Sequence, residues 1–203
     1  MERGAFEYRA YFNPTDHKAF PRRSSRLANC TVDDVAVVSD GGICNESAGE
    51  GTRRSTLDKT ILNEQWGGQV VAHGEIFVAP FLPALVGGEQ EGLATFLIQR
   101  SNDIVLAELI TLDALTVGQG VGTALVEALV SKLRGERVAV LRVTTTNDNL
   151  NALRFYQRRG FRITRVRPGV VDEARRIKPS IPVVGEYGIL IRDEIDLKRR
   201  VDI

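Results

Sequence analysis

Residues 116–125 read TVGQGVGTAL and place three glycines, Gly118, Gly120 and Gly122, at the start of a predicted helix. Glycine weakens a helix unless its freedom at positive φ or its missing side chain is used. Such a cluster therefore indicates a tight turn or a backbone that a ligand approaches closely. Consecutive N–H groups at a helix N-terminus form a site for anions, and residues 118–123 can surround a diphosphate. A turn that only lets helix and strand pack is the alternative.

The segments that flank this loop predict the fold class. Before it, the apolar stretches 83–88, 92–99 and 103–112 favour β-strands, and the short turns between them favour an antiparallel meander. After it, apolar residues recur at helical spacing across 121–133, and a glycine follows. The pattern changes from period two to period 3.6 at the glycine cluster, which therefore joins a strand to a helix.

The rest of the chain continues with short elements of both kinds. The sequence predicts a strand at 137–146, a helix at 147–160, a strand at 161–166, a helix at 171–177 and a last strand at 187–197. Asn147 or Asp148 is the expected cap of the first of these two helices. The fold class is therefore α/β, with a mixed, mostly antiparallel central sheet and flanking helices.

The N-terminal part differs in composition. Residues 39–58 are rich in Gly, Ser, Thr and charge and have no periodic apolar residue, which is typical of a flexible insertion. The flanking stretches 31–38 and 59–68 are interpreted as two pieces of one helical region, with Thr31 or Asp33 as its cap. The insertion is predicted to interrupt that helix.

The overall composition excludes several classes of protein. A chain of 203 residues with 43% hydrophobic and 26% charged residues is suited to one globular domain. The formal net charge of +1 gives no general attraction to nucleic acid. Cys30 and Cys44 lack the spacing of a zinc site or a disulfide framework and are interpreted as free thiols. With no signal segment or membrane-spanning run, we expect a cytoplasmic protein without a metal, a nucleic-acid partner or a membrane partner.

Two common phosphate-binding loops are excluded by spacing. A P-loop requires a lysine after its last glycine, whereas Thr123 follows Gly122 directly. The dinucleotide-binding fingerprint requires a glycine where Thr123 stands, and it belongs to an early parallel unit rather than to the end of a meander.

A second motif changes the interpretation of the loop. Residues 145–161 read TTNDNLNALRFYQRRGF. Together the two segments resemble the GNAT family of N-acetyltransferases, whose cofactor loop reads Arg/Gln-x-x-Gly-x-Gly/Ala and whose later motif reads Asn-x-x-Ala-x-x-x-Tyr-x-x-x-Gly-Phe. The loop match is VGQGVG at 117–122, and the later match consists of Asn149, Ala152, Tyr156, Gly160 and Phe161. The resemblance covers residues 60–197.

The resemblance implies acetyl-CoA as the co-substrate and assigns residues to it. The expected cofactor-binding residues are Val117, Gly118, Gln119, Gly120, Val121, Gly122, Thr123, Asn149, Ala152, Ile110 and Leu112. Among them, Asn149 matches the residue that bonds the pantetheine arm, and a backbone amide near Ile110 to Leu112 holds the oxyanion. Val117 replaces the Arg or Gln of the family, which removes one side chain from the loop but keeps its amides. Tyr156 matches the general acid that protonates the thiolate.

The general base is inferred from the strand before the loop. Glu108 is the one charge inside IVLAELITL, and an unpaired carboxylate on a buried strand is costly, so a functional role is expected. The alternative is that Glu108 faces solvent or pairs with an arginine. Asp113 ends the same strand and is expected to share the role or to attract a cationic amine.

Six other residues have weaker support for a functional role. Arg154, Arg158 and Arg159 meet the cofactor's 3′-phosphate or form a solvated face, and the solvated face is preferred for each alone. A further set, consisting of His17, Trp66 and His73, receives no role, because lone His and Trp residues are more often structural and no second metal ligand stands at suitable spacing.

The sequence thus predicts a divergent segment at 1–58 and an acetyl-CoA-binding acetyltransferase domain at 59–203. The expected activity is acetyl transfer to a primary amine by direct attack in a ternary complex, since no cysteine lies in the two motifs. The expected partner is a small-molecule or peptide amine, and the chain is a monomer or a homodimer. The alternative is a non-catalytic acyl-CoA-binding module of the same fold.

Overall fold

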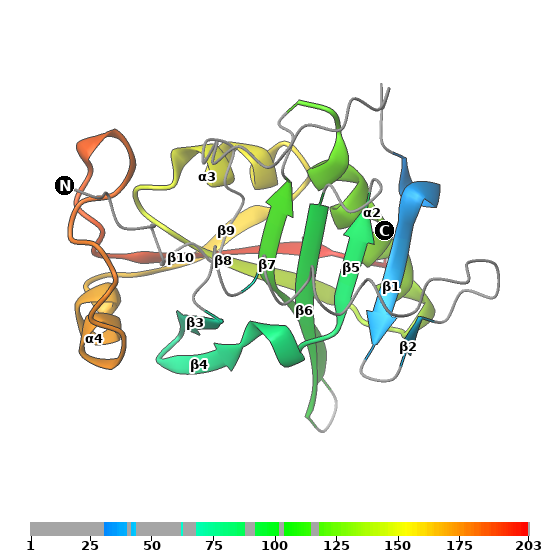
Figure 1. The fold of residues 1–203 in the computed structure, drawn as a ribbon, viewed down its shortest axis with the longest axis horizontal. Helices are drawn as coiled ribbons and strands as arrows, with labels where there is room; N and C mark the ends of the chain where they lie inside the picture. Colours follow the sequence, from blue (N-terminus) through cyan, green and yellow to red (C-terminus); the bar gives the residue numbers. More distant parts are fainter. Residues whose placement is uncertain are drawn as a thin grey trace.

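A computed structural model describes residues 31–39, 42–43, 62, 68–87, 92–101, 104–114 and 118–202. Eight strands form the main sheet: β1 (Val35–Ser39), β2 (Gly42–Ile43), β5 (Ala84–Gly87), β6 (Gly92–Ser101), β7 (Ile104–Ala114), β8 (Val140–Thr146), β9 (Arg162–Arg167) and β10 (Glu194–Arg200). Their order is β2-β1-β5-β6-β7-β8-β10-β9, and every pairing is antiparallel except β7 with β8 (Figure 1). The mixed, mostly antiparallel sheet that the sequence predicts is therefore confirmed.

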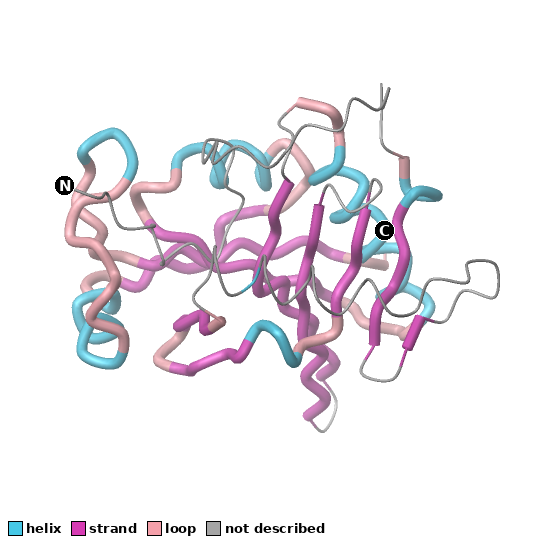
Figure 2. Tube along the Cα trace, viewed as in Figure 1, coloured by secondary structure: helices cyan, strands magenta, loops and turns pink. Residues whose placement is uncertain are grey.

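A small second sheet and three helices surround the main sheet in the described part of the chain (Figure 2). The small sheet is the hairpin of β3 (Gln69–Ala72) and β4 (Glu75–Val78), and the helices are α2 (Val121–Gly135), α3 (Leu150–Gln157) and α4 (Val170–Ile177). Single 3-10 turns cover Val32–Asp34, Ala79–Phe81 and Glu186–Gly188. No described helix has both the length and the apolar character needed to span a bilayer.

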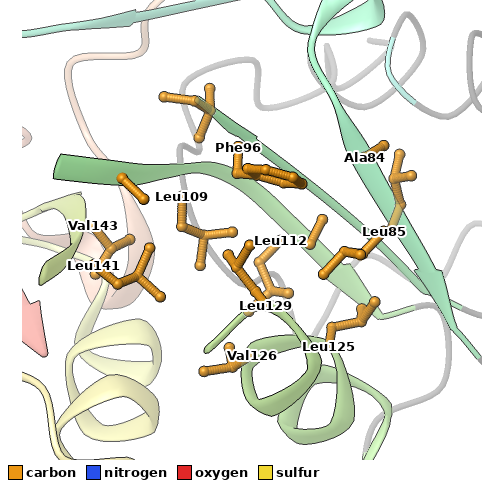
Figure 3. Close-up of a cluster of buried hydrophobic side chains, with 14 of the residues drawn as sticks. Ala84, Leu85, Phe96, Leu109, Leu112, Leu125, Val126, Leu129, Leu141 and Val143 are labelled. Atoms are coloured by element: carbon orange, nitrogen blue, oxygen red, sulfur yellow. The ribbon is translucent and has the colours of Figure 1, made fainter. Parts of the chain in front are cut away.

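The main core lies between α2 and the meander β5-β6-β7. Leu125 and Leu129 of α2 are fully buried, and in Figure 3 Leu129 lies beside Leu112 of β7 and Leu125 beside Leu85 of β5. The predicted meander and the predicted helix after the glycine cluster are both confirmed. Because the helix buries one leucine-rich face against the sheet, its first turn is fixed in place at the end of β7.

Two irregularities mark the end of β7. The register passes from Phe96↔Leu109 to Thr95↔Thr111, so Ile110 is an extra residue in a β-bulge. The parallel ladder with β8 is also short, and runs only from Leu106↔Val140 to Leu109↔Val143. The two central strands therefore separate just where the bulge bends β7.

The helical interpretation of residues 31–38 is wrong. Thr31 is the N-cap of a 3-10 turn, not of an α-helix, and its backbone N–H and its hydroxyl both donate to Asp34. Strand β1 follows this turn directly. The stretch VAVV consists largely of β-branched residues, and pairing with β5 satisfies its backbone. Of the predicted insertion at 39–58, only Ser39 and Gly42–Ile43 are described, and they belong to β1 and β2.

Two boundaries near the C-terminus also differ from the prediction. The cap of α3 is Asn149 rather than Asn147 or Asp148. The side chain of Asn147 is engaged elsewhere, since it donates to the carbonyl of Leu190 and accepts from the amide of Arg192. That anchoring holds 187–193 outside the sheet, so the last strand begins only at Glu194.

The contact of β6 with the start of α2 leaves no room for a side chain at Gly92. A Cβ there would lie 2.4 Å from Val121 Cγ1 and 3.0 Å from the carbonyl oxygen of Asp113. We expect Gly92→Ala to lower the free energy of unfolding by about 1–3 kcal/mol, measured by urea denaturation. Gly135→Ala is the matched control, because nothing lies within 4 Å of its Cβ, and it should be neutral or stabilising. Equal losses in both variants would contradict this packing.

Candidate active site

The described residues at the N-terminus of α2 leave its backbone exposed. Gly118 and Gly120 have φ of 86° and 84°, a region that side chains rarely adopt, and both are exposed. Gly120 is the N-cap residue, and no side chain caps the helix. The first amides of α2, at Val121, Gly122 and Thr123, therefore present the positive end of a 15-residue helix. Val117 lies outside the described residues.

A cation lies beside this helix end. The Arg159 guanidinium donates to Thr123 Oγ1 through Nε at 3.1 Å and through Nη2, and it lies 3.5 Å above the ring of Phe155. Burial, and secondarily the charge of Arg158, lowers the pKa of Arg159. Since a cation at a helix N-terminus is unfavourable, and no ion pair among the described residues includes Arg159, the site favours an anion. Arg154 and Arg158 are exposed, as the preferred interpretation expects.

The motif on α3 faces the core. Asn149 Oδ1 accepts the amide of Ala152 at 2.9 Å, and both residues are buried. Tyr156 is fully buried and makes edge contacts with the rings of Phe155 and Phe161, with centroids 5.2 and 5.3 Å away. The three motif residues thus share the inner side of α3, at spacings of three and four residues.

Glu108 belongs to a buried group of ion pairs. It is 1% exposed, its Oε1 is 2.6 Å from His73 Nε2, and its Oε2 accepts a hydrogen bond from Arg142. Glu108 and Arg142 are also directly opposite in the β7–β8 ladder. Alternation along β8 puts Arg142 and Thr144 on the face opposite to Leu141, away from α2. The pairing with an arginine that the sequence left as an alternative is therefore present.

Two carboxylates of β10 complete this group. Nδ1 of His73 is 3.9 Å from an oxygen of Glu194 and 3.9 Å from an oxygen of Asp196. Arg167 of β9 pairs with both carboxylates, at 2.8 and 2.6 Å. The hydroxyl of Thr144 donates to Asp196 at 2.8 Å and lies 3.1 Å from His73 Nε2. Buried charges are tolerated when they are paired, and here pairs link four strands with the β3–β4 hairpin.

The pKa of Glu108 is set by opposing effects. Burial raises the pKa, but the hydrogen bonds from His73 and Arg142, together with the charge of the guanidinium group, outweigh burial and bring the pKa below its usual 4.5. The group is therefore a stable carboxylate at neutral pH. Asp113 is buried too, but it lies five residues further along β7, about 16 Å in extended chain, and the structure does not bring it to Glu108.

Sequence reasoning missed His73, Arg142, Thr144 and the β10 carboxylates. One signal was present for His73, because VVAHGEIFV places a His-Gly pair between two apolar runs, as in a two-residue hairpin. Nothing local pairs a hairpin tip with a strand 35 residues later, so their contact follows only from the tertiary fold. His17 and Trp66 lie outside the described residues.

Several known proteins are similar to this chain in sequence or in fold. The sequence model of the acetyltransferase (GNAT) family matches residues 48–161. The uncharacterized protein YdhI of Bacillus subtilis is 42% identical over 115 residues, which are 57% of this chain and 69% of that protein. An acetyltransferase of the GNAT family from Elizabethkingia anophelis, solved with acetyl-CoA, has a TM-score of 0.52 at 17% identity, covering 83% of this chain and 99% of its own. A Bacillus subtilis acetyltransferase solved with CoA has a TM-score of 0.50 at 19% identity, over 70% and 83% of the two chains. The two structures support the fold.

The lowered pKa of Glu108 predicts a pH dependence of stability. Its contribution is fully present above pH 4.5 and is lost as the pH falls through the lower pKa of the folded state. Free energies of unfolding measured from pH 7 to pH 3 should therefore fall more steeply on acidification for the wild type than for Glu108→Gln. At pH 7 the variant should be less stable by on the order of 3 kcal/mol, because Arg142 is left without its partner. Glu173→Gln, at an exposed position of α4, should follow the wild-type curve, and a Glu108→Gln curve parallel to the wild type would contradict the assignment.

Proposed function

Because the chain belongs to the acetyltransferase (GNAT) family, we propose that it transfers the acetyl group of acetyl-CoA directly to a primary amine. The observation that carries the proposal is the open N-terminus of α2, with two left-handed glycines, an uncapped first turn and Arg159 beside it. The acceptor is a small molecule or a peptide, and the chain works in the cytoplasm as a monomer or a homodimer. Acetyl-CoA supplies an activated thioester.

Acetyl-CoA is proposed to bind at the N-terminus of α2 and along the inner side of α3. The amides of residues 118–123 hold the diphosphate, and Arg159 adds the positive charge that Val117 does not supply. The left-handed glycines keep this backbone free of side chains, so the phosphate oxygens reach the amides. Asn149 and Ala152 border the pantetheine arm, where the β7–β8 ladder has ended. The contacts of Arg159 with Thr123 and Phe155 support binding of a phosphate rather than the solvated face that the sequence alone favours.

The chemistry is proposed to take place at the bulge of β7. A backbone amide between Ile110 and Leu112 holds the oxyanion of the tetrahedral intermediate. Tyr156 gives a proton to the departing thiolate. Removal of the ammonium proton depends on Glu108, and Asp113, further along β7, attracts a cationic amine. Both cysteines of the chain lie outside the two motifs, which supports direct attack without an acetyl-cysteine intermediate.

A non-catalytic acyl-CoA-binding module is the second candidate. The engagement of both Glu108 oxygens by His73 and Arg142 favours it, because such a group also stabilises a fold without any chemistry. Both candidates bind acetyl-CoA through the same loop. Only turnover separates them.

Binding at the loop is tested with Gly120→Glu. The new side chain occupies the space of the diphosphate and repels its charge, so calorimetric titration should show acetyl-CoA affinity falling at least about 100-fold. Gly169→Glu is the matched control, since Gly169 is also a left-handed N-cap residue, at α4, with nothing within 4 Å of its Cβ. That variant should bind as the wild type does. Equal affinity of Gly120→Glu and the wild type would contradict the site.

Catalysis is tested with Tyr156→Phe and Glu108→Gln. We expect kcat to fall about 100-fold in the first variant, which removes the proton donor to the thiolate, and at least about tenfold in the second, which removes a carboxylate on which removal of the ammonium proton depends. The dissociation constant of acetyl-CoA should stay within about twofold, since neither side chain contacts the proposed diphosphate site. Full binding by a wild-type protein that turns over no amine would instead support the non-catalytic module.

A further inference from the structure

The tip of the β3–β4 hairpin holds a residue that the roles above do not use. His73 and Gly74 form the two-residue turn between Ala72 and Glu75, and their φ values are 57° and 79°. Turns with two positive φ angles favour Asn, Asp or Gly at the first position, because other side chains are strained there. Strain of this kind persists where the side chain has contacts that offset it, and functional sites are where it concentrates.

The hydrogen bonds around the ring fix which nitrogen carries the proton. Thr144 donates its one hydroxyl proton to Asp196, so towards His73 Nε2 its oxygen can only accept. Glu108 is a carboxylate and also only accepts. Nε2 of the neutral ring therefore carries the proton, and Nδ1 carries the basic lone pair.

The surroundings of Nδ1 leave its lone pair available. This nitrogen is buried and makes no hydrogen bond to a described residue. Three carboxylates face the ring, from Glu108 on β7 and from Glu194 and Asp196 on β10. Glu194 and Asp196, each 3.9 Å from Nδ1, carry oxygens that accept hydrogen bonds and donate none, so the lone pair of Nδ1 stays available for a proton.

Resting on the proposed amine acetylation, we propose that His73 is the residue that accepts the proton of the acceptor amine, and that Glu108 is a positioning residue that orients its ring. Glu108 lies two residues before the bulge at Ile110, about 7 Å along β7 from the amides assigned to the oxyanion. The His73 side chain is 12% exposed and belongs to a separate two-stranded sheet. A small displacement of the tip, or one water, connects Nδ1 with the amine.

The proton and bond changes balance. The ammonium gives one proton to His73 Nδ1, and the freed lone pair forms the C–N bond to the thioester carbon. The C–S bond breaks, its electron pair leaves with sulfur, and the thiolate takes a proton from Tyr156. The nitrogen releases its second proton as the amide forms, which restores Tyr156, and His73 returns its proton to water. The net products are one amide, one thiol and one proton.

His73→Gly is the decisive variant, because glycine adopts the positive φ of this turn without strain and leaves a cavity of imidazole size. Thiol release is followed at saturating acetyl-CoA with spermidine, phenethylamine and a peptide with a free N-terminus. We expect kcat to fall about 10²- to 10³-fold with little change in acetyl-CoA affinity. Added imidazole should raise the kcat of this variant at least about tenfold, and substituted imidazoles should raise kcat in the order of their basicity.

Two further variants separate catalysis from architecture. His73→Asn keeps a turn-compatible residue that is not a base, and it should lose as much activity as His73→Gly without rescue. Glu108→Gln keeps an oxygen that accepts from Nε2 and should lose less than His73→Gly. A kcat within about threefold of wild type in either His73 variant, a loss that imidazole does not rescue, or a larger loss in Glu108→Gln overturns the proposal while the proposed function stands. No turnover of any of the amines by the wild type overturns the proposed function, and the role of His73 with it.

Discussion

The short parallel ladder between β7 and β8 is the constraint on which the rest of the structure depends. It ends at Leu109↔Val143, and the bulge at Ile110 follows at once. Beyond that point β8 continues against β10, whereas β7 continues against β6. A parallel pair in the middle of an otherwise antiparallel sheet needs a crossover connection, and α2 provides it. The start of α2 is thereby placed where the two strands have separated.

The two faces of the sheet at this point differ in character, since one is apolar and the other is charged. On one face, leucines of β7 and α2 form a dry core that fixes the helix in position (Figure 3). On the other face, alternation brings Glu108, Arg142 and Thr144 under the β3–β4 hairpin. Adjacent residues of β7 thus face opposite sides of the sheet: Leu109 packs in the core with α2, and Glu108 belongs to the charged group.

The charged group also couples parts of the chain that are far apart in sequence. Glu108 joins the hairpin to the central strands, and Arg167 joins the edge strand β9 to the two carboxylates of β10. Removal of one member leaves others buried without a partner, so the free energies of such changes are not additive. The hairpin is held from its other side by the small core of Val71 with α4 and by Lys178, which donates to the carbonyl of Gln69.

The sequence by itself determined the meander, the helix after the glycine cluster and the motif on α3, because each depends on periodicity and turn residues within one segment. It also placed Gly118 and Gly120 at the start of a helix and identified Glu108 as the one charge on a buried strand. The helical interpretation failed at 31–38, where β-branched residues and pairing with β5 select a strand. Only the tertiary structure decided that Glu108 meets His73 and Arg142, and that Arg159 meets Thr123. Those contacts join residues that are 34 to 36 positions apart, and their geometry follows from strand register and helix packing, which no local pattern encodes.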